Sequence, residues 1–225
     1  MLKERLEQVE SRIAKAAARA GRRRSDITLL AVTKKFPAST IREAYDLGLR
    51  EFGENYVQEF EVKRLELGEC PAAQFHLIGH LQSNKTKKAV EIFRVIQTVD
   101  TQKLARRLHD DVGNLEAGAA LDVMIEVKLS PEETKSGVAP ENLPVLVEAI
   151  ESCGNLRLLG LMTIPPWTDD GERSRPYFAR LRGLAEENHL TQLSMGMSHD
   201  FEVAIEEGAT IIRVGTALFG PRKRD

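Results

Sequence analysis

The most informative stretch of the sequence is an apolar segment that ends in two lysines and a proline, Ile27-Thr28-Leu29-Leu30-Ala31-Val32-Thr33-Lys34-Lys35-Phe36-Pro37. A short apolar run with such boundaries predicts a strand that is buried on both faces. Parallel α/β folds place their ligands at the carboxyl ends of these strands. Either lysine could form a Schiff base with an aldehyde there, because partial desolvation lowers the pKa of an amine. The alternative is that both lysines are simply solvated, as most lysines are.

The same pattern of an apolar strand followed by an amphipathic helix continues along the whole chain. Strands are expected at residues 27–33, 49–53, 74–79, 93–99, 121–127, 156–162, 190–194 and 210–214. Helices are expected at residues 37–48, 54–67, 83–90, 101–112, 140–152, 171–188, 199–207 and 216–219, with an additional one in front at residues 2–20. This strict alternation predicts a parallel sheet.

Eight strand–helix units favour a closed (β/α)8 barrel, the TIM barrel, over an open sheet. The alternative is a Rossmann-like sheet, but no G-x-G-x-x-G motif follows any of the predicted strands. No linker, composition shift or repeat divides the chain. We therefore expect one α/β domain over residues 1–225, in which residues 1–24 carry an extra N-terminal helix packed on the barrel.

The composition is that of an ordinary soluble globular protein. Of the 225 residues, 42% are hydrophobic and 29% are charged, and the net charge of −2 gives no reason to expect nucleic acid as a partner. Cys70 and Cys153 lie far apart without metal-ligand spacing, which suits free thiols in a reducing compartment. The N-terminus is charged, and no apolar run reaches membrane-spanning length. We expect a cytoplasmic protein with no membrane partner and no metal site.

The loops after the last two predicted strands form the best candidate phosphate site. TIM barrels often bind phosphate with these two loops and the start of a short helix. Gly196 and Gly215 allow close backbone approach, and Ser198 and Thr216 add hydroxyl groups. Both loops lead into helices, whose free N–H groups favour an anion. The alternative is that the glycines only serve tight turns.

Two polar residues interrupt apolar strands and need an explanation. Arg213 lies between Ile212 and Val214, and burying a guanidinium without a partner is costly. It could pair with a barrel carboxylate such as Glu126 or contact a ligand. His76 also lies within an apolar strand, where a histidine is more often a hydrogen-bonded core residue than a catalyst.

These pieces fit one ligand when they are taken together. A Schiff-base lysine, a phosphate site and a buried cation are the three groups that pyridoxal 5′-phosphate (PLP) needs for its aldehyde, its phosphate and its ring nitrogen. PLP is therefore the expected cofactor.

Six motifs of the chain resemble the YggS/PROSC family of pyridoxal phosphate homeostasis proteins. They are residues 30–34 (LAVTK), 52–59 (FGENYVQE), 76–85 (HLIGHLQSNK), 160–164 (GLMTI), 194–198 (SMGMS) and 213–216 (RVGT). The similarity covers about residues 25–220 in the expected order. The resemblance implies a single barrel that is similar to the N-terminal domain of alanine racemase and that binds PLP without established enzymatic activity.

Carried over residue by residue, the resemblance selects Lys34 and not Lys35 as the Schiff-base lysine. It implies that Arg213 faces the pyridine nitrogen and that Lys135 is a second lysine near the site entrance. The cofactor site implied in full is Lys34, Asn55, His76, Lys135, Met162, Ser198, Arg213, Gly215 and Thr216, with no catalytic residue. Lys128 departs from the pattern, because the family usually has Asn after Glu-Val on the fifth strand.

The resemblance implies a role in intracellular PLP homeostasis, as a carrier or regulator of PLP supply to apo PLP-dependent enzymes. A PLP-dependent amino acid racemase is the alternative, and a sugar-phosphate isomerase is a third that makes no use of the lysine and arginine. Alanine racemase takes a catalytic tyrosine from a second domain of a partner subunit. This chain has only Tyr45, Tyr56 and Tyr177 and lacks room for that domain, so we expect a monomer and no enzyme.

Overall fold

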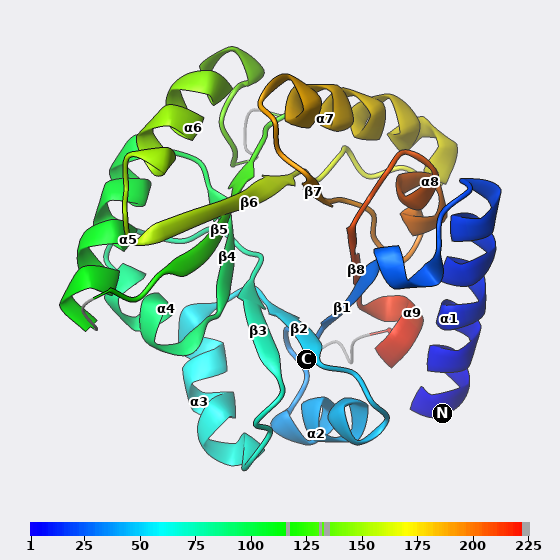
Figure 1. The fold of residues 1–225 in the computed structure, drawn as a ribbon. Helices are drawn as coiled ribbons and strands as arrows, with labels where there is room; N and C mark the ends of the chain where they lie inside the picture. The colour runs from blue at the N-terminus through cyan, green and yellow to red at the C-terminus, as the bar shows by residue number, and fades with distance from the viewer. Residues whose placement is uncertain (116–117, 131, 133–135, 222–225) are drawn as a thin grey trace.

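The computed structural model describes residues 1–115, 118–130, 132 and 136–221, and in it parallel strands close into a barrel (Figure 1). The strand order is the order of the sequence, and the last strand pairs with the first. The strands are β1 (Thr28–Val32), β2 (Glu51–Glu54), β3 (Gln74–Leu77), β4 (Val95–Val99), β5 (Leu121–Glu126), β6 (Leu156–Met162), β7 (Gln192–Ser194) and β8 (Ile211–Val214). The closed (β/α)8 barrel expected from the sequence is confirmed.

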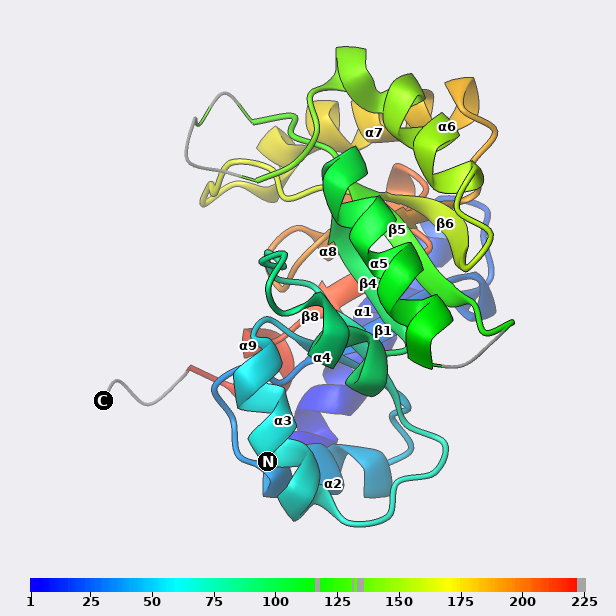
Figure 2. The ribbon, with the colours of Figure 1, turned by 90° about the vertical axis from the view of Figure 1, so that its left-hand side faces the viewer.

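Helices surround the barrel, and Figures 1 and 2 show them on its outside. The α-helices are α1 (Leu2–Arg19), α2 (Ala38–Asp46), α3 (Val57–Leu67), α4 (Thr86–Ile92), α5 (Gln102–Leu115), α6 (Leu143–Glu151), α7 (Arg175–Glu187), α8 (Phe201–Glu206) and α9 (Thr216–Phe219). Short 3-10 turns precede β1, α6 and α7. Within the described residues, no helix is both long and apolar enough to cross a membrane.

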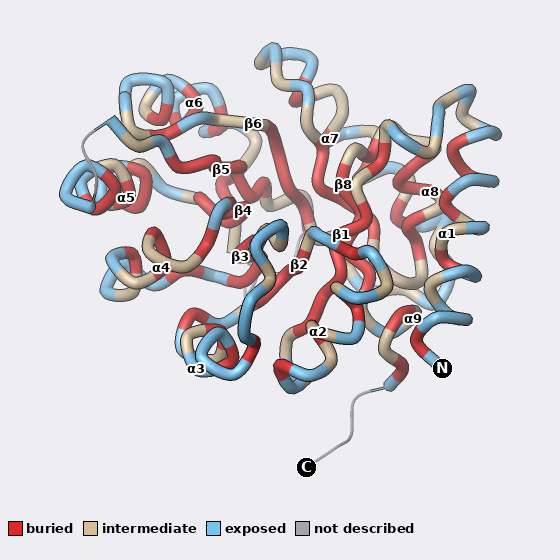
Figure 3. Tube along the Cα trace, turned by 60° about the horizontal axis from the view of Figure 1, so that its bottom comes forward, coloured by how far each residue is buried: buried red, intermediate tan, exposed pale blue. Residues whose placement is uncertain are grey.

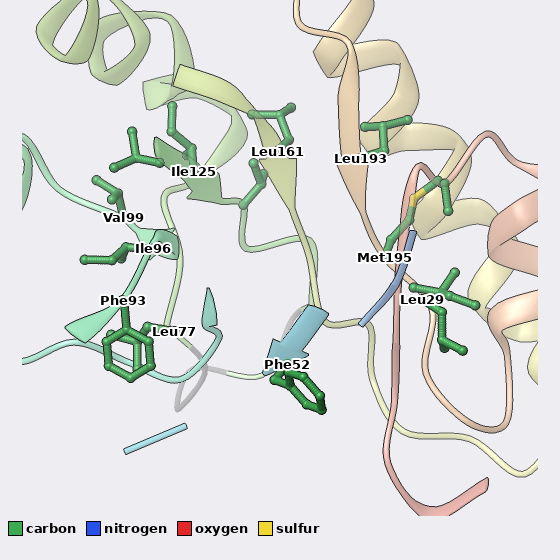
Figure 4. Close-up of a cluster of buried hydrophobic side chains, with 14 of the residues drawn as sticks. Leu29, Phe52, Leu77, Phe93, Ile96, Val99, Ile125, Leu161, Leu193 and Met195 are labelled. Atoms are coloured by element: carbon green, nitrogen blue, oxygen red, sulfur yellow. The ribbon is translucent and has the colours of Figure 1, made fainter. Parts of the chain in front are cut away.

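The alternation of side chains along each strand divides the apolar residues into two clusters. Leu29 and Ala31 of β1 join the large core between the strands and the helices, whereas Leu30 and Val32 join a smaller cluster with Ile78, Met124 and Ile211. Figure 4 shows members of the large core from successive strands, and Figure 3 shows that burial concentrates on the strands. Lys34 lies two residues beyond Val32, a member of the smaller cluster.

The N-terminal helix α1 lies against α8 (Figure 1) and is held there by ion pairs as well as by its apolar stripe. Arg12 Nε lies 2.6 Å from Glu202 Oε1, and Arg19 pairs with Glu206 at 2.7 Å. Val9 and Ile13 of the stripe are buried. The extra helix expected in front of the barrel is therefore confirmed as a cover over the last βα unit.

One boundary differs from the expectation in a way that affects the site. Glu54 was expected to begin a helix, but it is the last residue of β2 and is fully buried. The Ile78 N–H donates to the Glu54 carbonyl at 2.9 Å, so the strand ladder extends one residue further. Helix α3 begins only at Val57.

Candidate functional site

The carboxyl ends of β8, β1 and β2 bring three predicted site segments together, because these strands are neighbours in the barrel. Gly215 follows β8, Lys34 follows β1, and Asn55 follows β2. A Cβ atom on Gly215 would lie only 3.5 Å from Val32 Cβ, which shows how closely the loop after β8 approaches β1. The predicted phosphate loop and the predicted lysine therefore share one edge of the barrel.

The two lysines after β1 have different environments. Lys34 is half-buried, whereas Lys35 is exposed and has left-handed backbone with φ of 63°. Thr33, one residue earlier, is fully buried, and its hydroxyl donates to Glu54 Oε1 at 2.8 Å. Of the two amines, that of Lys34 has the partly desolvated position that a reactive lysine needs.

The loops after β7 and β8 meet at Ser198. Its hydroxyl oxygen accepts hydrogen bonds from the N–H groups of Gly215 at 3.3 Å and Ala217 at 3.2 Å. These N–H groups lie at the start of α9, where backbone donors favour an anion. Gly196 has φ of 91°, so a tight turn explains this glycine. The structure thus brings Ser198 against the turn at residues 215–217, and we call this junction of the two loops the Ser198 cradle.

Arg213 is buried in the barrel and is held by neutral partners. Its guanidinium donates to Ser194 Oγ and to the Thr163 carbonyl, both at 2.8 Å. Within the described residues it forms no ion pair, so the expected alternative of a pair with Glu126 is not observed. Burial lowers the pKa of Arg213 to about 10, while the charges of Asp200 and Glu126 oppose this shift. The guanidinium therefore stays charged at neutral pH.

A chain of hydrogen bonds runs from Arg213 through the barrel interior. The Ser194 hydroxyl donates to Gln97 Oε1 at 2.6 Å, and Gln97 Nε2 lies 2.9 Å from His76 Nδ1. An amide nitrogen can only donate, so Nδ1 of His76 accepts and its Nε2–H donates to Glu51 Oε2 at 2.8 Å. This relay, defined as Arg213, Ser194, Gln97, His76 and Glu51, joins five strands with every donor pointing in one direction.

A cavity of about 220 Å³ opens at the same end of the barrel. Its lining residues are Asn55, Ile78, Gly79, His80, Glu126, Val127, Lys128, Ser130, Ser136 and Ile164. The Asn55 Oδ1 atom is buried and has no hydrogen-bond partner among the described residues. A buried polar atom without a partner is rare, so this atom fits a site that a polar ligand completes.

Glu126 is a buried carboxyl group on the wall of this cavity. Burial raises its pKa to about 7, the charge of Asp100 adds to the rise, and the charge of Arg213 opposes it. Asp100 is itself a group whose pKa is raised by burial, with the charge of His80 opposing the rise. The cavity thus contains a carboxyl group that changes charge near neutral pH, which the sequence did not reveal.

Of the predicted site residues that the structure describes, only Asn55 lines this cavity, and Lys34, His76, Met162, Ser198, Arg213, Gly215 and Thr216 are not among its lining residues. Met162 is fully buried at the end of β6. Both ring nitrogens of His76 are engaged, by Gln97 and Glu51. Lys135 lies outside the described residues.

Sequence reasoning missed two groups of residues that support the site. Gln97 lies within the apolar strand β4, and its interruption of that strand was a usable signal. Glu59 and Lys63 of α3 have the appearance of an ordinary pair of charges one helical turn apart. Only the packing of α3 against β1 and β2 reveals that Lys63 is buried.

Comparison with known proteins places the chain among PLP proteins. The pattern of the family described as "Alanine racemase, N-terminal domain" matches residues 5–223. The pyridoxal phosphate homeostasis protein of Aquifex aeolicus is 47% identical over 226 residues, with 98% of each chain covered. That of Pseudomonas aeruginosa is 48% identical over 222 residues, which cover 97% of this chain and 95% of the relative.

A solved structure agrees with these relatives. PipY of Synechococcus elongatus with PLP bound is 40% identical and superposes with a TM-score of 0.86, covering 98% of this chain and all of the other. A match over nearly the full length at this identity shows the family as well as the fold. The chain therefore belongs to the pyridoxal phosphate homeostasis proteins of the alanine racemase N-terminal domain family.

Proposed function

We propose that this chain binds PLP at the carboxyl end of the barrel and acts in PLP homeostasis, as a carrier or regulator of PLP supply. The observation that carries the proposal is that Lys34, the Ser198 cradle and the buried Arg213 lie on, or directly after, three neighbouring strands of the barrel. The membership of this chain in a family named for PLP homeostasis supports the same conclusion.

Each group of the proposed site has one task. The Lys34 amine would form the Schiff base with the PLP aldehyde, and Ser198, Gly215 and Thr216 would bind the phosphate. Arg213 faces the ring nitrogen, while Asn55 and Met162 line the cofactor. His76 contributes through the relay to Arg213, and Lys135 is included on the family resemblance alone.

The charge of Arg213 favours a carrier over a catalyst. PLP supplies an electrophilic carbonyl and, when its ring nitrogen is protonated, a strong electron sink. A guanidinium that stays charged disfavours a proton on that nitrogen, because like charges repel. None of the three tyrosines, all of which the structure describes, is among the residues that line the cavity.

The assignment of the lysine is tested by PLP titration of purified protein, followed by visible absorbance and by mass spectrometry after borohydride reduction. We expect wild type and Lys35→Gln to retain one covalently attached PLP and Lys34→Ala to lose it. Attachment that persists in Lys34→Ala and disappears in Lys35→Gln would contradict the assignment.

The carrier role is tested by incubating the PLP-loaded protein with an apo PLP-dependent enzyme. We expect the apo-enzyme to gain activity when it is mixed with the loaded protein, and not when it is mixed with the PLP-free chain. Separately, we expect light scattering to show a monomer. Absence of any transfer would contradict delivery to apo-enzymes.

A PLP-dependent amino acid racemase is the second candidate, and Glu126 is the observation that favours it. A carboxyl group with a pKa of about 7 on the cavity wall has the acid–base property that proton transfer at neutral pH requires. Chiral chromatography of L-amino acids incubated with the loaded protein distinguishes the two. Sustained formation of D-isomers that Glu126→Gln and Lys34→Ala both abolish would establish turnover.

A further inference from the structure

A cluster of charges, in which Glu54 and Lys63 are buried and Glu59 is partly exposed, lies behind the lysine turn, between β1, β2 and α3. Glu54, at the end of β2, is fully buried, and Lys63 of α3 is 7% exposed. The Lys63 ammonium lies 2.9 and 3.1 Å from the two carboxylate oxygens of Glu54 and 2.5 Å from Glu59 Oε1. We call these three residues the Lys63 cluster.

The Lys63 cluster bonds to the backbone on both sides of Lys34. The Lys63 ammonium donates to the Thr33 carbonyl at 2.8 Å, on the residue before Lys34. Glu59 Oε1 accepts the N–H of Lys35 at 2.5 Å, on the residue after it. The turn that presents the Lys34 side chain is therefore fixed at both ends by one set of charges on a neighbouring helix.

The conformation of Lys35 shows why this support matters. Its φ of 63° is in the left-handed region, which side chains other than glycine rarely adopt. A strained residue persists in such a conformation only when its surroundings hold it there. The Glu59 carboxylate supplies that restraint, since it accepts the N–H of this residue.

The alternative is that the Lys63 cluster only stabilises the contact of α3 with the barrel. Burying charges is costly, and apolar residues of similar volume often stabilise a fold as well or better. Apolar residues could not bind the Thr33 carbonyl and the Lys35 N–H. The charges are thus explained by what they do to the turn.

We propose that Glu59 and Lys63 are positioning residues for Lys34, which hold its backbone so that its amine meets the PLP aldehyde in a reactive geometry. This inference rests on the proposed function, because it gives the turn a task only if Lys34 binds PLP. PLP would contact the side chain of Lys34, whereas Glu59 and Lys63 influence that side chain only by holding the backbone of its turn.

The test compares Glu59→Ala, Glu59→Gln and a control variant by PLP titration, well below the unfolding temperature of each. We expect Glu59→Ala to weaken covalent PLP binding about tenfold, because losing a residue that orients a reactive group commonly has an effect of this size. Glu59→Gln should restore most of the affinity, because its amide oxygen can still accept the Lys35 N–H. The control, Arg157→Met, breaks an ion pair with Asp122 at the amino end of the barrel and should leave affinity unchanged.

Hydrogen exchange of the Lys35 amide in the PLP-free protein provides an independent measurement. We expect exchange to accelerate in Glu59→Ala and to stay slow in Glu59→Gln and Arg157→Met. Affinity and exchange that match wild type in Glu59→Ala would overturn the inference, as would equal losses in Arg157→Met. A wild-type protein that binds no PLP would instead overturn the proposed function.

Discussion

The two charged groups expected to contact PLP are supported in opposite ways. Lys34 has an ionic support outside the barrel wall, the Lys63 cluster, whose members bond to the backbone of the turn. Arg213 has a neutral support inside the barrel, where Ser194 and the Thr163 carbonyl bond directly to the guanidinium. A lysine whose amine reacts needs a fixed backbone and a side chain that can move. A guanidinium that only has to face a ring nitrogen is itself immobilised.

The two supports also differ in their extent along the sequence. The Lys63 cluster and the turn that it holds lie within residues 33–63. The relay joins residues from 51 to 213, on five strands. Removing one partner of the buried ion pair should therefore cost much of the free energy of unfolding. Removing one neutral hydrogen bond of the relay should cost only a modest amount.

The comparison is tested most severely by removing the charge of Lys63. Lys63→Met leaves the Glu54 carboxylate buried without its ammonium, so we expect the free energy of unfolding to fall by about 3–5 kcal/mol. Urea denaturation at pH 7 measures this change. The double variant Glu54→Gln/Lys63→Met should recover a large part of the loss, and a loss that persists in full would contradict the ionic interpretation.

Glu126 tests the contrast between ionic and neutral support from the other side, because it is a buried carboxyl group that forms no ion pair within the described part of the chain. Its pKa rises from 4.5 to about 7 on folding, so the folded state favours the protonated form. The stability that this group contributes is present below pH 4.5 and is lost as the pH rises to about 7, by up to about 3 kcal/mol.

Urea denaturation of the PLP-free protein between pH 4.5 and 8 provides the measurement for Glu126. Glu126→Gln should lack this part of the pH dependence, so the variant gains stability relative to wild type as the pH rises. A constant difference between the two proteins across the range would show that Glu126 does not titrate there.

Ser194→Ala tests one neutral link of the relay and is expected to have a smaller effect than the changes at Lys63 and Glu126. It removes an acceptor of the guanidinium and the donor to Gln97, which we expect to cost about 2 kcal/mol of unfolding free energy. Glu51→Gln, at the partly exposed end of the relay, should cost less because its amide oxygen still accepts from His76. A larger loss for Glu51→Gln than for Ser194→Ala would mean that the relay depends on charge.

The sequence was sufficient to predict the barrel and to place the predicted site residues at one of its edges. The alternation of apolar strands with helices determines the fold class, and Lys34, Ser198 and Gly215 each follow a predicted strand. The contacts behind the site were not predictable, because they depend on which face of each strand meets which neighbour. Glu54 was assigned to a helix, and the Gln97 contact with Ser194 joins residues 97 positions apart.

The single donor direction of the relay restricts which side chains can replace its members. The position of Ser194 requires a group that accepts from the guanidinium and donates onward, as threonine also does. The position of Gln97 requires an acceptor at one end and a donor at the other, which a carboxylate cannot supply. Substitutions at these positions should therefore be accepted in matched sets, so that the barrel interior changes as one unit while the surrounding apolar residues vary singly.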